Sequence, residues 1–132
     1  QNVAAQVHTV SGCASSSPLD KTVMNGQTGP GTGTDAVTST AQTPTTDGQY
    51  IFGAAHTWLS SHPGTAGTGF TERSSVQSDL MVSEDVVQGT AASIATTFTN
   101  IGSGGGIWLT GMATIKAAST AAPNSFYLRR VQ

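Results

Sequence analysis

Charged side chains are scarce in this sequence, which limits what the protein can bind. Only 9% of its 132 residues are Asp, Glu, Lys or Arg, against about 25% in an average soluble domain. Five basic residues and a net charge of −2 provide no basic face to neutralise phosphates, so nucleic acid is not an expected partner. The apolar residues are spread along the chain in short runs, which indicates a folded protein rather than a disordered one.

Cysteine and long apolar runs are also missing. The single Cys13 excludes an intrachain disulfide and a cysteine-based zinc site, and leaves a minor role or a disulfide to another copy as alternatives. No run of 18 apolar residues occurs, so we expect no membrane insertion. The sequence starts at Gln1 without a signal peptide, as a product trimmed after export would, so we expect a secreted or extracellular-surface location.

Small hydroxyl side chains and strand-like patterns are what the sequence does contain. There are 21 Thr and 15 Ser residues, a composition common in secreted β proteins, where hydroxyls supply surface polarity without charge. Alternation with a period of two predicts strands at 3–10, 21–24, 36–43, 48–59, 70–76, 79–88, 93–99, 107–117 and 125–131.

These strands are separated by turn signals, such as Asp47-Gly48 and the glycine-rich stretch 25–35. No convincing amphipathic helix accompanies them. We therefore predict an all-β fold: one domain over 1–132, built as a two-sheet antiparallel, jelly-roll-like β-sandwich with eight or nine strands. The strand at 48–59 carries apolar residues on both faces, which predicts a central position in its sheet.

Several short motifs carry a resemblance to known proteins. Residues 66–117 contain the turn "AGTGFT", the acidic strand "SEDVVQ", the strand "TAASIATTFT" and the final strand "WLTGMATIK", and "TTDGQYIFGAA" at 45–55 precedes them. In these motifs the chain resembles a β-sandwich module of uncharacterised secreted bacterial proteins. The resemblance covers about residues 45–117 and implies the fold and an exported location. It implies no activity, because the shared motifs are structural.

No sequence motif for catalysis or cofactor binding stands out. A Gly-x-Ser-x-Gly nucleophile turn is absent, and "GSGGG" at 102–106 lacks the following helix that a phosphate site needs, so it is interpreted as a hairpin turn. His8, His56 and His62 do not have the spacing of a metal motif. We therefore expect no enzyme activity and no cofactor.

The acidic residues do not form a reactive pair either. Glu84 and Asp85 are adjacent on a strand and should point to opposite faces, which excludes a glycosidase pair. Glu84 could lie opposite Glu72 or Arg73 on a neighbouring strand, and a cross-strand ion pair is the preferred interpretation. The acids that could contribute to a calcium site are isolated in the sequence, so no metal site is predicted: Asp20, Asp35 and Asp47.

Aromatic residues offer one candidate ligand site. Tyr50, Trp58 and Trp108 could form a stacking platform for sugars. The alternative, which we prefer, is that these large side chains pack in the core.

The functional hypothesis that follows is a structural one. We expect a subunit of an extracellular filament, pilus-like fibre or surface coat, joined to copies of itself through sheet edges. The terminal strands 3–10 and 125–131 supply the candidate assembly contacts, which are Val3, Ala5, Val7, Phe126, Tyr127 and Leu128. Two alternatives stay open: a secreted carbohydrate-binding or adhesive module, with glycans as partners, and a phage or virus surface decoration protein.

Overall fold

The computed structural model describes residues 5–27, 37–57, 64–76, 81–99 and 107–119. Within these ranges the chain forms strands and no helix, and so no helix capable of crossing a membrane. The strands are β1 (Leu19–Gln27), β2 (Val37–Thr38), β3 (Gln49–Thr57), β4 (Thr65–Ala66), β5 (Thr71–Val76), β6 (Met81–Gln88), β7 (Thr97–Thr99) and β8 (Trp108–Ile115).

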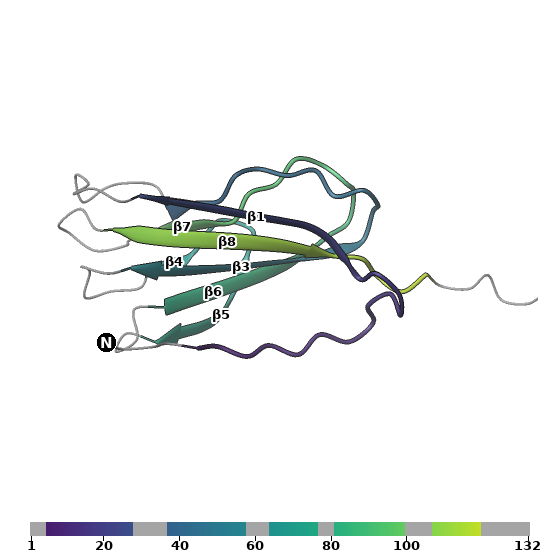
Figure 1. Ribbon diagram of the computed structural model, residues 1–132, viewed down its shortest axis with the longest axis horizontal. Helices are drawn as coiled ribbons and strands as arrows, with labels where there is room; N and C mark the ends of the chain where they lie inside the picture. The colour runs from purple at the N-terminus through teal and green to yellow at the C-terminus, as the bar shows by residue number, and fades with distance from the viewer. Residues whose placement is uncertain (1–4, 28–36, 58–63, 77–80, 100–106, 120–132) are drawn as a thin grey trace, which may run out of the picture.

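The strands form two antiparallel sheets that pack together. The larger sheet has the order β1-β8-β3-β6-β5, seen side by side in Figure 1, and the smaller has the order β2-β7-β4. The predicted all-β, two-sheet antiparallel sandwich is therefore confirmed. A jelly roll distributes eight strands over two sheets as two Greek keys. Here the sheets have five and three strands, because β5 pairs with β6, and the jelly-roll part of the prediction is not confirmed.

Strand β3 lies at the centre of the larger sheet, between β8 and β6, as its sequence predicts. Its alternate residues, such as Ile51 and Ala55, are buried between the two sheets. The predicted turn before it is also present: Gly48 has a positive φ of 71°, which glycine adopts without strain. The Gly48 N–H donates to the Gln88 carbonyl at 3.0 Å and so ties the start of β3 to the end of β6.

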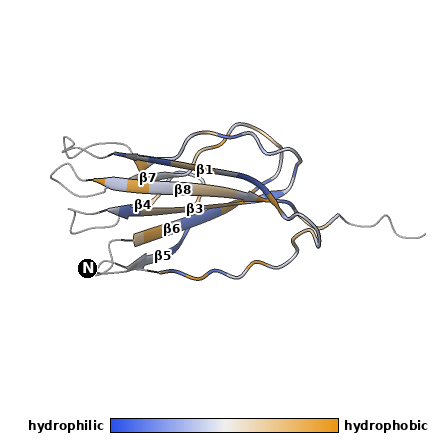
Figure 2. Cartoon of the chain, viewed as in Figure 1, coloured by the Kyte–Doolittle hydropathy of each residue, from blue (hydrophilic) through white to orange (hydrophobic). Residues whose placement is uncertain are grey.

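The interior contains fewer large apolar residues than a typical core. Its buried hydrophobic residues are Val37, Ile51, Ala55, Val82, Phe98, Trp108 and Met112. Threonines complete it, since Thr57, Thr96, Thr110 and Thr114 are all buried. Figure 2 accordingly shows strands of mixed hydropathy rather than uniformly hydrophobic ones. The expectation that hydroxyls serve mainly the surface was therefore incomplete, because β-branched threonine also packs well on the inner, pleated face of a sheet.

Some predicted strands are shorter or absent. The 36–43 and 93–99 stretches contribute only β2 and β7, plus an isolated bridge between Gln42 and Ile94. The 21–24 stretch, in contrast, extends to the nine residues of β1. Residues 5–10 are not part of any strand ladder, and the predicted strand at 125–131 lies outside the described residues.

Candidate functional site on the outer sheet face

Residues 5–12, here called the N-terminal segment, cross the outer face of the larger sheet, the face that points away from the smaller sheet. Figure 1 shows this stretch in purple, running beside β5. Gln6 donates from Nε2 to Ser74 Oγ on β5 at 3.3 Å. The His8 ring lies over Phe52 of β3, with centroids 4.7 Å apart, and its Nε2 is 3.2 Å from Ser83 Oγ of β6. Polar side chains therefore hold the segment against three neighbouring strands.

The backbone of this segment is not paired in the way a strand would be. Residues 5–11 make no backbone–backbone hydrogen bond to any other described residue. The alternation predicted from the sequence is nevertheless present, because Gln6 and His8 are half-buried while Ala5 and Val7 are exposed, Val7 at 91%. Regular pairing starts only at Gly12, whose carbonyl accepts from Ala118 N at 2.7 Å. The segment is thus extended but attached mainly through side chains.

A buried carboxylate beside the segment organises the polar groups of this face. Asp85 Oδ2 accepts hydrogen bonds from the Tyr50 hydroxyl and from Arg73 Nε, each at 2.6 Å. The Asp85 side chain is 6% exposed, whereas that of Arg73 is half exposed. Burial alone would raise the pKa of Asp85, but the bonds from Arg73 and Tyr50 outweigh it and hold the pKa below its usual value. Burial raises the pKa of Tyr50, and the hydrogen bond to the Asp85 carboxylate and its charge raise it further.

The expected ion pair between Glu84 and Arg73 is wrong, because Arg73 pairs with Asp85 instead. The residue opposite Glu84 in the ladder is Glu72, the other neighbour considered. Glu84 and Asp85 do point to opposite faces, as predicted. Glu84 points between the sheets and Asp85 points outward, toward Arg73. A β-bulge between Glu72 and Ser74 inserts Arg73 as the extra residue, and so both Arg73 and Ser74 interact with groups on the outer face.

These groups surround a shallow hollow of about 390 Å³, here called the Arg73 hollow. One wall comes from the N-terminal segment and the other from β3, β5 and β6; the lining residues are His8, Thr9, Val10, Ser11, Tyr50, Arg73 and Asp85. Within the described part of the chain, only the Nε atom of Arg73 is hydrogen-bonded. Its terminal nitrogens are left as donors at the rim.

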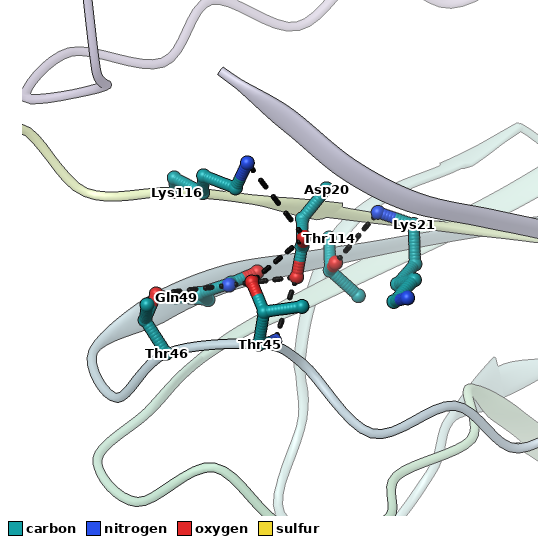
Figure 3. A network of polar contacts seen from close by, with 7 residues as sticks. All are labelled: Asp20, Lys21, Thr45, Thr46, Gln49, Thr114 and Lys116. Carbon is teal, nitrogen blue, oxygen red and sulfur yellow. Dashed lines mark hydrogen bonds and ion pairs between the residues drawn. The ribbon is translucent and has the colours of Figure 1, made fainter. Parts of the chain in front are cut away.

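Asp20 forms a second polar cluster, at the start of β1, and Figure 3 shows it from close by. Its Oδ2 accepts from Thr45 N and Gln49 Nε2, and its Oδ1 accepts from Thr45 Oγ1, all at 2.8 Å, with Lys116 Nζ 3.8 Å from Oδ1. Burial would raise the pKa of Asp20, but these bonds and the Lys116 charge outweigh it and lower it to about 2. The carboxylate is already used by the protein, so this cluster is a structural lock.

The structure places the other candidate calcium ligands apart. Asp47 Oδ1 accepts from Ala91 N at 2.7 Å and thereby joins two turns, while Asp35 lies outside the described residues. No group of three or more His, Cys, Asp or Glu residues that could hold a metal is found in the described ranges. Of the histidines, His8 lies on the Arg73 hollow, His56 is half-buried on β3, and His62 lies outside the described residues.

The sugar platform proposed from aromatic residues is not formed by the two of them that can be located. Tyr50 lies on the outer face of β3, whereas Trp108 is 8% exposed, belongs to the core cluster and donates from Nε1 to Gln27 Oε1 at 3.1 Å. Core packing is therefore confirmed for Trp108. Trp58 lies outside the described residues. Tyr50 alone remains at a candidate site, and no sequence pattern indicated that Arg73 and Asp85 would join it.

Comparison of the chain with protein-family models, with curated proteins and with solved structures finds no match.

Proposed function

We propose that the chain is a structural subunit that assembles with copies of itself by strand addition. The N-terminal segment of one copy would pair with the free edge of β1 in the next. One observation carries this proposal: among the described residues, an extended segment without backbone partners occurs in the same molecule as an edge strand that is uncharged over 22–27.

The edge at β1 is suited to accept a strand. Among the described residues β1 pairs with β8 alone. Its stretch 22–27 contains no charge, no proline and no bulge, and Met24 is 66% exposed. Natural sheets usually protect their edge strands with charges, prolines or bulges, because an unprotected edge pairs with other chains.

The two edges of the larger sheet differ in where their protective features lie. In β1 the charged Asp20 and Lys21 and a register shift lie at the start of the strand and leave 22–27 regular. The six-residue β5 carries Glu72 and Arg73, and the bulge between Glu72 and Ser74 interrupts its ladder. Charges and bulges on an edge strand oppose pairing with another chain. This asymmetry favours β1 as the acceptor.

The exchange is favourable in rough energetic terms. When the N-terminal segment leaves its own sheet, it loses the side-chain contacts of Gln6 and His8. Each of these contacts contributes about 1 kcal/mol. A new ladder supplies several backbone hydrogen bonds of about 1 kcal/mol net each. Burial of the exposed Ala5 and Val7 against the next copy adds to this. These are two of the assembly contacts predicted from the sequence, while the other four lie outside the described residues.

Two alterations test the proposal by light scattering after size-exclusion chromatography and by electron microscopy. Deleting residues 1–10 should abolish the polymers, because it removes the donor. Met24→Lys should weaken them by placing a charge on the acceptor edge. Val87→Lys is the matched control: Val87 is equally exposed at 66%, but its strand, β6, is paired on both sides. A monomeric parent protein, or polymers unchanged by the deletion, would refute the proposal.

A further inference from the structure

We propose that the Arg73 hollow binds a neutral, polyhydroxylated ligand the size of a single sugar ring. This inference does not rest on the proposed assembly, since it concerns a copy whose N-terminal segment lies on its own sheet, where it forms one wall of the hollow. It differs from the aromatic platform considered above, because neither tryptophan takes part.

The dimensions of the hollow suit a small ligand. Its volume of about 390 Å³ falls in the lower part of the range of roughly 300–1,000 Å³ common for ligand sites. An adjoining hollow of about 160 Å³ shares Val10, Ser11 and Tyr50 with it and adds Val87 and Ile115. Apolar surface therefore lies directly beside the polar groups, as the C–H face and the hydroxyl edge of a sugar ring require.

The charges favour a neutral ligand over an ion. Arg73 and Asp85 are paired with each other at 2.6 Å, so the charged side chains lining the hollow sum to zero. A ligand carboxylate would be attracted by Arg73 but repelled by Asp85, and a ligand ammonium group would be attracted by Asp85 but repelled by Arg73. A hydroxyl group both donates and accepts hydrogen bonds, and it can therefore satisfy either side of the pair.

The wall contributed by the N-terminal segment supplies further hydrogen-bonding groups. Thr9 and Ser11 are exposed and carry hydroxyls on the hollow. The backbone N–H and C=O groups of residues 8–11 have no backbone partners among the described residues. Together with the terminal nitrogens of Arg73, they form a set of donors and acceptors at the rim, while the bonds to Asp85 fix Tyr50 and Arg73 in place.

Saturation-transfer difference NMR with single sugars tests this inference, because the method works on monomers and on large assemblies. The probes are glucose, galactose and mannose, with glucuronate, galacturonate and glucosamine as charged counterparts. We expect at least one neutral hexose to bind at millimolar concentration and more tightly than its charged counterparts. Repeating the titration on Met24→Lys separates the two proposals. That variant has a charged acceptor edge, so the N-terminal segment of each copy should stay on its own sheet and keep the hollow complete, and hexose binding there does not depend on assembly.

Three variants locate the site. Thr9→Val and Arg73→Met should each weaken hexose binding about tenfold, the loss of one good hydrogen bond. Thr68→Val is the matched control, since Thr68 is also exposed but lies in the turn between β4 and β5 and lines neither hollow; it should change nothing. Because Thr9 is exposed, its variant will fold even if Arg73→Met does not. The inference is overturned if no neutral hexose binds, if a charged counterpart binds more tightly, or if Thr9→Val and Thr68→Val behave alike.

Discussion

Thr96 occupies the space in which a side chain of Gly53 would lie. Gly53 is on β3, with its side-chain position facing the smaller sheet, and Thr96 immediately precedes β7 of that sheet. A Cβ atom built on Gly53 would be 2.6 Å from Thr96 Cβ and closer still to its methyl group. The two sheets therefore approach one another at this point as closely as they do only because residue 53 has no side chain.

Gly53→Ala should destabilise the protein by about 1–3 kcal/mol, the usual cost of an added methyl group in a packed interior. Thr96 is fully buried and has little room to move away. Urea unfolding followed by circular dichroism measures the loss. Gly89→Ala is the control, because a Cβ there meets nothing within 4 Å. Equal stabilities for the two variants would contradict this account of the packing.

Glu84 predicts a pH dependence of stability. Its carboxylate is fully buried on β6 and accepts from Gly67 N at 2.7 Å and from Thr97 N at 2.9 Å, both in the part of the chain that forms the smaller sheet. Burial raises the pKa of Glu84 from 4.5 to about 7, because the two hydrogen bonds offset only part of the desolvation.

Between pH 4.5 and about pH 7, Glu84 loses its proton in the unfolded chain but keeps it in the folded chain. This group's contribution to stability is therefore complete below pH 4.5. It falls as the pH rises, by at most about 1.4 kcal/mol per unit, and levels off above about pH 7. Glu84→Gln should flatten this slope in urea titrations from pH 4.5 to 8. It should also cost about 1–2 kcal/mol at acidic pH, since an amide accepts through one oxygen only. Parallel pH profiles for the two proteins would exclude Glu84 as the source.

Asp20 predicts a dependence of the opposite sign. Its folded pKa of about 2 lies below its ordinary value of 3.8, so its contribution is present above pH 3.8 and is lost as the pH falls toward 2. Asp20→Asn should cost about 1–3 kcal/mol at pH 6. It removes the charge that the hydrogen bonds from Thr45 and Gln49 stabilise, and the amide nitrogen would face either these donors or the Lys116 ammonium group.

The cost of Asp20→Asn should shrink toward pH 2, which thermal unfolding at several pH values will show. Glu72→Gln, on the exposed face of β5, removes the same charge and is the control. A constant difference between Asp20→Asn and the parent protein down to pH 2 would argue against this lock.

Tyr50 and Asp85 should prove energetically coupled. Tyr50→Phe removes a hydrogen bond to a buried carboxylate and should cost about 1.5–3 kcal/mol. In a double-mutant cycle with Asp85→Asn, measured by urea unfolding, the two changes should cost less together than the sum of each alone. Strict additivity would mean that the 2.6 Å contact contributes nothing to stability.

The sequence was sufficient to predict the strands whose two faces differ clearly in burial. In β3 and β8 every second residue is buried, and the same alternation is visible in the letters. It was not sufficient for the N-terminal segment: the alternation there is real, but the side chains facing the sheet are Gln6 and His8. Polar side chains of this kind can hold a segment without a backbone ladder, and alternation does not distinguish the two arrangements.

The Asp20 cluster and the Arg73 hollow could not be predicted from the sequence for a different reason. Asp20 meets Thr45 and Gln49 across 25 and 29 residues of sequence, and this contact depends on how the sheets pack. The partner of Arg73 depends on a bulge, which shifts the register by one residue. The adjacency of Glu84 and Asp85 did predict that one of the two carboxylates would point inward. It did not predict that Glu84 would be the buried one and that Asp85 would face outward, toward Arg73.

The unequal edges of the larger sheet limit how copies can join. Direct pairing of β1 with β1 would occupy, in both molecules, the one edge of the larger sheet that has a regular uncharged stretch among the described residues, and growth through this sheet would stop at two. Donation of the N-terminal segment leaves every molecule with one donor segment and one acceptor edge, and the resulting polymer has two unlike ends. A fibre built in this way would lengthen without ever spreading sideways into a ribbon.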